Sequence, residues 1–186
     1  SFKLPLRHIV HKLKPIDLVP VLSFLYLKGK CRYCNEKLSK QYPVIELITG
    51  IVFVIIYYKL GINLVFLKAI VLASIVIVMS IIDYRHFIIP DKLSIFTLVS
   101  ALFFNVLLRD ISIKSLILAF LLGGGLLFII ALIGPMGGGD IKVMAGFSLY
   151  LGIERTVAAL LLAFILAGII GIILIVLKIK DRKDYI

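Results

Sequence analysis

Six apolar segments follow one another along this chain, and they limit what it can fold into. They lie at residues 44–58, 64–82, 88–108, 115–133, 141–151 and 156–177. A helix needs about 20 apolar residues to cross the hydrocarbon core of a bilayer. The segment at 141–151 is too short to span by that rule. We expect it to be either a short tilted helix or a half-helix buried among its neighbours.

The composition supports a membrane environment. Hydrophobic residues make up 62% of the 186 residues and charged residues 17%, against about 45–50% and about 25% in soluble domains. These values exclude a disordered chain, a disulfide-stapled secreted domain and an ordinary cytosolic enzyme. The sequence predicts an all-α, polytopic integral membrane protein of about six transmembrane helices.

The positive charges predict the orientation of these helices. Residues 1–43 contain nine of the 21 lysines and arginines. If this region is cytoplasmic and all six segments cross, 16 of the 21 fall on the inner side, which is the bias expected of cytoplasmic loops. We therefore expect both termini in the cytoplasm, with a basic cytoplasmic region at 1–43 and a membrane-embedded domain at 44–186. This distribution accounts for the net charge of +11 by contact with lipid headgroups, without nucleic acid.

Four carboxylates lie within or beside the apolar segments, where charge is costly and usually functional. They are Glu46, Asp83, Asp91 and Asp140. The expected topology places all four at the cytoplasmic ends of their helices. Structural roles are the alternative. Asp91, which follows a proline, would cap a helix. Asp140 would be a carboxylate at a helix N-terminus, where the helix dipole favours negative charge. Asp83 would pair with Arg85 or Lys92.

Glycines distinguish Asp140 from a simple helix-terminal carboxylate. Three of them, at 137–139, directly precede it, and a cap does not need them, whereas close approach of the backbone does. They also favour a mobile loop at this point. A second triplet, at 123–125, lies inside an apolar segment and is expected to permit close helix packing.

Asp83 and Asp140 lie on separate predicted helices, and their convergence would favour one chemistry. Two neighbouring carboxylates do not both ionise easily, so the pair is expected to share a proton. The ionised member can then deprotonate a water molecule while the protonated member donates to a peptide carbonyl. This is the logic of aspartic proteases, and it needs neither a metal nor a covalent nucleophile.

Several motifs occur in one order along nearly the whole chain. Gly137-Gly138-Gly139-Asp140 fits a GxGD pattern with Gly138 at the variable place. Before it come Asp83-x6-Pro90-Asp91 and, earlier still, Cys31-x2-Cys34 followed by Tyr42-Pro43 and Glu46. Together these motifs resemble those of the bacterial type IV prepilin peptidases, which are GxGD-type intramembrane aspartic peptidases.

The resemblance implies an enzyme of the bacterial cytoplasmic (inner) membrane that removes the short basic leader of prepilins or pseudopilins at the cytoplasmic face. By motif position, Asp83 and Asp140 correspond to the family's catalytic pair. The candidates for substrate contact are Glu46, Asp91, Gly138 and Gly139. Proteolysis of this kind needs no cofactor. Many bacterial members also N-methylate the new terminal residue using S-adenosylmethionine.

The cysteines depart from the family pattern, which usually has two CxxC pairs suited to zinc. Only Cys31 and Cys34 are present, so a four-cysteine site is excluded. His8 and His11 lie beside the positions of the missing pair, and two cysteines with two histidines form an established structural zinc set. The alternatives are a CxxC pair without metal, reduced in the cytosol, and a disulfide, which that compartment disfavours.

The family's first membrane span, expected before this loop, is missing, so either the protein is a truncated version or part of the chain was left out. This departure and that of the cysteines both touch the region associated with methyl transfer, so S-adenosylmethionine is expected only if that role is retained.

Two other classes of function compete with the peptidase. One is a small proton- or cation-coupled transporter that uses intramembrane carboxylates, although the acids lie at one end of the segments and form no ladder across the membrane. The other is a non-catalytic scaffold with a metal-stapled loop.

Overall fold

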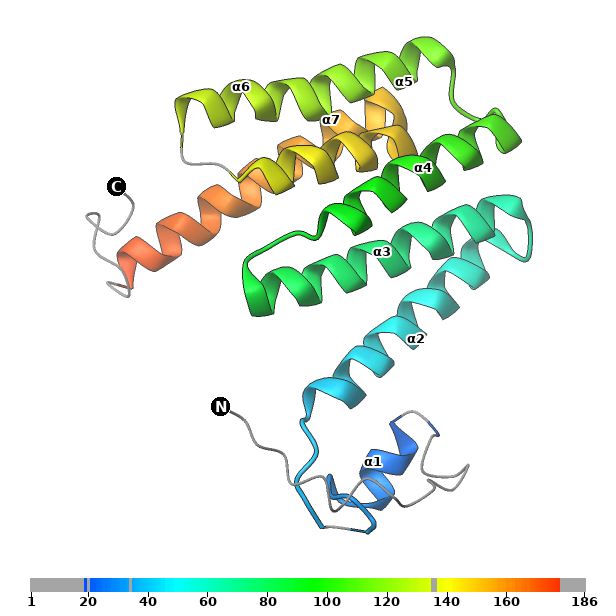
Figure 1. Ribbon diagram of the computed structural model, residues 1–186, viewed down its shortest axis with the longest axis vertical. Coiled ribbons are helices and arrows are strands. Elements are labelled where there is room, and N and C mark those ends of the chain that lie inside the picture. The colour runs from blue at the N-terminus through cyan, green and yellow to red at the C-terminus, as the bar shows by residue number, and fades with distance from the viewer. Residues whose placement is uncertain (1–18, 20, 34, 135–136, 178–186) are drawn as a thin grey trace. The chain divides into compact units, whose positions relative to one another are not determined.

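The computed structural model describes residues 19, 21–33, 35–134 and 137–177. In these parts the chain is helical, without strands, and has an isolated antiparallel bridge between Lys30 and Lys37. The all-α prediction is therefore confirmed (Figure 1). The elements are α1 (Leu22–Tyr26), α2 (Gln41–Leu60), α3 (Leu64–His86), α4 (Asp91–Leu108), α5 (Ile113–Phe120), the π-helical turn η3 (Leu121–Gly125), α6 (Leu126–Ile133) and α7 (Gly138–Val176).

Among the described residues, five helices are long and apolar enough to cross a membrane. They are α2, α3, α4, the continuous run Ile113–Ile133, and α7. Each predicted apolar segment lies almost entirely on one of them. Large apolar side chains along α2 and the later part of α7 are exposed, as expected for helices whose surroundings are lipid. The chain is a multi-pass membrane protein.

The chain divides into two compact units, Ser1–Ser74 and Ile75–Ile186. In the first unit, Asn63 organises the three-residue link between α2 and α3. Its side-chain oxygen accepts the Phe66 N–H at 2.8 Å, and its amide nitrogen donates to the Leu60 carbonyl at 2.7 Å. Because Asn63 satisfies groups at the end of α2 and at the start of α3, a short link is enough to connect them.

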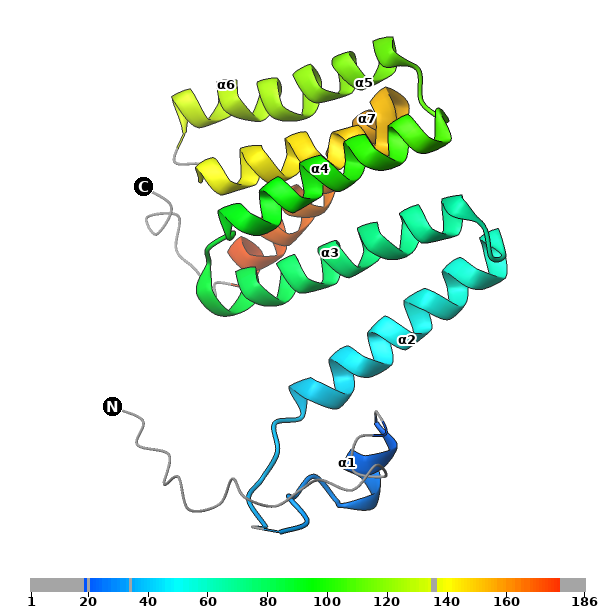
Figure 2. The same ribbon diagram turned by 45° about the vertical axis from the view of Figure 1, so that its right-hand side comes forward.

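A break at Gly152 divides α7 into two arms, 138–151 and 153–176. Gly152 has φ +72° and ψ 174°, which are not helical. Figures 1 and 2 show that the chain turns back within α7, so that the second arm runs in the direction opposite to the first. The Ile153 N–H, freed by the break, donates to Ser115 Oγ at 3.0 Å. The predicted segments 141–151 and 156–177 therefore lie on two separate helical arms. At 1.5 Å per residue the first arm is only about 21 Å long, short of the roughly 30 Å hydrocarbon core.

Gly152→Ala is expected to lower the free energy of unfolding by about 1–2 kcal/mol, because an alanine at positive φ is strained. A Cβ there would also lie 3.1 Å from Ile111 Cγ2. Gly171→Ala is the matched control, since it lies in the helical second arm and its Cβ would meet no atom within 4 Å. The measurement is unfolding of both variants in mixed detergent micelles. Equal stability of the two variants would contradict a conformational role for Gly152.

The second unit owes its close helix packing to small residues. The Cβ positions of Gly123 and Gly124 face Ser148 and Ala145 of α7 at 2.8 and 3.1 Å, so the prediction of close packing is confirmed for these two glycines. On the other side of α7, Gly146 faces Thr97 of α4, with 2.9 Å from its Cβ position to Thr97 Cγ2. Helices that contact through small residues bring their backbones close, as is common in membranes.

Buried hydroxyl and amide groups in this core find partners on helix backbones. Thr97 is fully buried and donates to the Leu93 carbonyl at 2.8 Å. Asn105, near the end of α4, donates across to the Leu149 carbonyl of α7 at 2.7 Å. These bonds are needed because lipid offers no alternative partner for a buried polar group.

Candidate functional site

Asp83 and Asp140, predicted as a pair, come together at one end of the second unit. Asp83 lies in the last turn of α3 and Asp140 in the first turn of α7. The charge of Asp83 acts on the carboxyl group of Asp140. Both residues are exposed, so water can reach both carboxyl groups.

The short link between α3 and α4, residues 87–90, follows Asp83 closely and contacts the start of α7 beside Asp140. Ile89 of this link contacts the backbone of α7 at Gly139, whose Cβ position lies 3.2 Å from Ile89 Cβ. Any side chain at position 139 would push the start of α7 away from the link. The expected close approach of backbone is thus confirmed at Gly139. Gly138 and Gly139 are helical, in the first turn of α7, so the triplet does not form a loop at these two positions. Gly138 faces open space.

Asp91 does not cap α4. The cap is Pro90, and Asp91 is the first helical residue. Its carboxylate Oδ1 instead pairs with Lys142 Nζ of α7 at 2.6 Å. The capping alternative was wrong because the Pro90 carbonyl accepts the Ser94 N–H at 3.2 Å, so the helix already begins before the Asp91 side chain could cap it. Sequence reasoning also missed Lys142 as a site residue, since nothing in the pattern relates two positions 51 residues apart.

Glu46, the fourth candidate, belongs to the first unit. It lies in α2, and its carboxylate Oε2 accepts the Val21 N–H at 2.8 Å. It therefore ties the chain before α1 to α2.

Of the four candidate zinc ligands, Cys31 is described, whereas Cys34, His8 and His11 lie outside the described residues. Cys31 sits in the turn between the bridged lysines, where its N–H donates to the Glu36 carbonyl at 2.9 Å and its carbonyl accepts the Asn35 N–H at 3.0 Å. Within the described part of the chain, no three histidine, cysteine or acidic residues are grouped as metal ligands.

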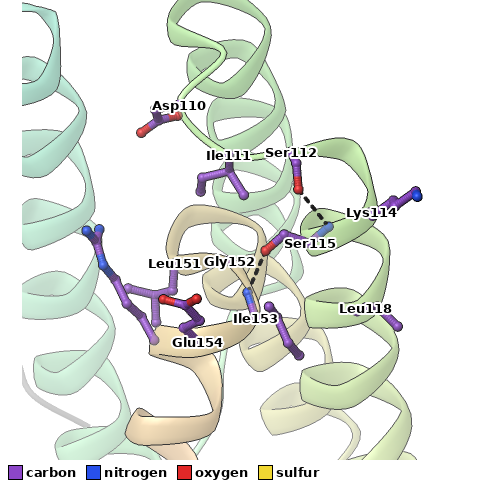
Figure 3. A pocket seen from close by; sticks show the side chains of 11 residues that line it. Asp110, Ile111, Ser112, Lys114, Ser115, Leu118, Leu151, Gly152, Ile153 and Glu154 are labelled. Atoms are coloured by element: carbon purple, nitrogen blue, oxygen red, sulfur yellow. Dashed lines mark hydrogen bonds between the residues drawn. The ribbon is translucent and has the colours of Figure 1, made fainter.

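A polar cavity of about 560 Å³ lies at the α7 break and the α4–α5 link, away from the aspartate pair. Figure 3 shows Ser115 joining α5 to the break there, with the Ile153 N–H bonded to its hydroxyl oxygen and its own N–H donating to Ser112 Oγ. Its lining mixes both signs of charge, from Asp110, Lys114, Glu154 and Arg155. Sequence reasoning did not find this cavity, because its lining comes from two stretches of chain, 110–118 and 151–155, that are far apart in the sequence.

The fold and the site define a multi-pass membrane protein with two interacting aspartates at the ends of its helices. The family described as "Type IV leader peptidase family" matches residues 70–172, and that described as "Bacterial Peptidase A24 N-terminal domain" matches residues 7–60. The chain belongs to the type IV leader peptidase family. The resemblance drawn from the motifs is confirmed, and the transporter alternative is not supported.

Curated relatives carry the same assignment. "Prepilin leader peptidase/N-methyltransferase" of Bacillus subtilis (strain 168) is 36% identical over 165 residues, covering 86% of this chain and 65% of the relative. The proteins so named from Aeromonas hydrophila and Neisseria gonorrhoeae are 30% and 27% identical, covering 92% and 90% of this chain. The chain spans 65%, 61% and 60% of the length of these three relatives. No solved structure matches the chain.

Proposed function

We propose that this protein is an intramembrane aspartic endopeptidase that removes the basic leader from prepilins or pseudopilins. The observation that carries this proposal is the electrostatic effect of Asp83 on Asp140, two exposed residues on separate helices. Membership of the leader peptidase family supports the same reaction.

The two carboxyl groups divide the acid and base roles. One, ionised, removes a proton from a water molecule whose oxygen attacks the carbonyl carbon of the scissile peptide bond. The other, protonated, donates its proton to the carbonyl oxygen. The C–N bond of the tetrahedral adduct then breaks, and the departing amine takes the proton that the first carboxylate accepted. One hydroxyl group of the adduct returns its proton to the second carboxylate, which leaves a carboxylic acid and restores the pair. Hydrolysis is balanced with one water molecule and no further reactant.

The surroundings of Asp83 suit a substrate that changes from basic to apolar at the cut. Tyr84, Phe87 and Ile88, which follow Asp83, are 79%, 86% and 66% exposed. They offer an apolar surface for the helix after the cut, which we propose enters laterally from the bilayer. Gly138 faces open space in the first turn of α7, and we propose that it and Gly139 let the extended substrate backbone approach Asp140.

The basic leader needs local acids, because a chain of net charge +11 does not attract a cationic segment from a distance. Glu46 and Asp91 are the proposed contacts. The side chain of Asp91 is 69% exposed even while Oδ1 is paired, so its other oxygen remains open to a cation.

The proposed setting is the bacterial cytoplasmic membrane, with both termini and the aspartate pair on the cytoplasmic side. Residues 1–43 would form the cytoplasmic region and 44–186 the membrane-embedded peptidase domain. The excess of lysine and arginine expected on the inner side supports this orientation. Cysteine accessibility to a membrane-impermeant reagent, with single cysteines placed at positions 59 and 92 in intact cells, tests it. Labelling at position 92 and not at 59 would reverse the orientation.

Two cofactors are proposed in addition, a structural zinc ion and S-adenosylmethionine. A zinc ion would be held by Cys31, Cys34, His8 and His11 and would cross-link the cytoplasmic loop. If elemental analysis finds no zinc in the purified protein, this site is disproved. The relatives' names include N-methyltransferase, so methyl transfer from S-adenosylmethionine is a second proposed activity, and we assign no residue to it. Neither cofactor takes part in proteolysis.

The proposed function is tested with purified protein in detergent and a prepilin that has a short basic leader, a glycine before the cut and an apolar helix after it. Mass spectrometry is expected to find the leader released after the glycine. An intact substrate, at enzyme levels where the Bacillus subtilis relative cleaves it, would overturn the proposal.

A further inference from the structure

The ion pair between Asp91 and Lys142 joins α4 to the start of α7, which carries Asp140. Asp91 begins α4, directly after the four-residue link from α3, which bears Asp83. Lys142 lies two residues after Asp140 in α7. With Lys142 Nζ 2.6 Å from Asp91 Oδ1, the start of α7 is held against the start of α4.

Stability alone does not explain this pair. The side chains of Lys142 and Asp91 are 55% and 69% exposed, and exposed ion pairs contribute about 0–1 kcal/mol. Further along the same two helices, Gly146 packs on Thr97 and Asn105 bonds to the Leu149 carbonyl. These buried contacts hold α4 to α7 without help from the ion pair, whose effect is confined to the end where the aspartates lie.

The lysine charge is not directed at Asp140 itself. Residues two apart on a helix do not face each other, and the ammonium group of Lys142 is bonded to Asp91. The ammonium group of Lys142 is therefore the partner of Asp91.

We propose that Asp91 and Lys142 are positioning residues, whose ion pair sets the separation and orientation of the Asp83 and Asp140 carboxyl groups. This inference rests on the proposed peptidase function and deepens it. The positioning role needs a different arrangement of charge from the one that a leader contact by Asp91 needs. A leader contact needs negative charge at position 91, whereas positioning needs opposite charges across positions 91 and 142, in either order.

A charge swap separates these requirements. The variants are Lys142→Met, Lys142→Arg, Asp91→Lys, and the double variant Asp91→Lys with Lys142→Asp, all assayed for kcat and KM on a prepilin. Small misplacement of reacting groups costs up to about 10²-fold in rate, so we expect Lys142→Met and Asp91→Lys to lower kcat by about 10–100-fold. KM should not change in Lys142→Met and Lys142→Arg, which leave Asp91, the proposed leader contact, in place. Lys142→Arg, which keeps the charge, and the double swap should recover most of the lost kcat.

Lys92→Met is the matched control, because it removes an exposed lysine next to Asp91 and leaves the pair intact; it should behave as wild type. Thermal unfolding in detergent should be similar for all variants, as expected for an exposed pair. Wild-type kcat in Lys142→Met would overturn the positioning role. So would a double swap whose kcat is no better than that of Asp91→Lys.

The outcome for the proposed function is read separately. If wild type releases the leader and Asp83→Asn does not, the peptidase assignment stands whatever the Lys142 variants do. A wild-type protein that releases no leader would overturn both proposals.

Discussion

Asp83→Asn and Asp140→Asn are each expected to abolish nearly all leader cleavage while the protein still inserts and folds. Asparagine is nearly the same size as aspartate but neither ionises nor carries an acid proton. General acid and base groups contribute about 10²–10⁴-fold each. Because the two carboxyl groups act as a unit, the double variant should be little worse than either single variant. The measurement is the rate of leader release in detergent, at matched protein concentration.

The control for this prediction is Asp110→Asn. Asp110 is also an exposed aspartate of the second unit, but it lines the cavity at the α7 break, away from Asp83 and Asp140. It should keep the wild-type rate. Full activity in Asp83→Asn or in Asp140→Asn would disprove the dyad, and equal losses in all three variants would point to a general effect on folding.

Gly146→Ala is expected to destabilise the second unit and to slow cleavage, because it forces α4 and α7 apart. The new Cβ would lie 2.9 Å from Thr97 Cγ2 and 3.2 Å from Thr97 Cβ. Thr97 cannot easily rotate away, since its hydroxyl is bonded to the Leu93 carbonyl at 2.8 Å and the residue is fully buried. Overpacking of this kind costs about 1–3 kcal/mol. The measurement is the unfolding midpoint in mixed micelles, together with the rate of leader release.

Gly168→Ala is the matched control, because it lies in the second arm of α7 with no atom within 4 Å of its Cβ position. Alanine is favoured over glycine in a helix by about 1 kcal/mol, so this variant should be at least as stable as wild type. Adding Thr97→Ser to Gly146→Ala removes the methyl group at 2.9 Å and should restore part of the stability. If this double variant is no more stable than Gly146→Ala alone, the contact with Thr97 is not the cause.

The membrane-spanning helices were predictable because their signal is local. An apolar run of sufficient length is a helix in lipid whatever its neighbours do, since every backbone group must be bonded within the segment. The short segment at 141–151 was harder to interpret. Only the positive φ of Gly152 shows that it is one arm of a reversal, and glycine in an apolar run does not by itself reveal its backbone angle.

Asp83 and Asp140 were predicted as a candidate pair from their motifs, but the role of the nearby Asp91 was predicted wrongly. Asp91 follows a proline in a pattern typical of a helix cap, yet the structure makes it the first helical residue and pairs it with Lys142. Helix capping depends on residues that are adjacent in the chain. An ion pair between distant positions depends on which helices pack together and at what register, and that information is spread over the small residues of the α4–α7 contact.

The sequence by itself determined the membrane class, the helical fold, the family and the identity of Asp83 and Asp140 as the candidate pair, because hydrophobic length and motif order are properties of consecutive residues. Only the tertiary structure decided the break at Gly152, the contact of Gly139 with Ile89, and the partner of Asp91. Each of these depends on atoms from segments far apart in the chain. Their distances are set by how closely the glycines allow the backbones to approach, and local sequence patterns do not encode those distances.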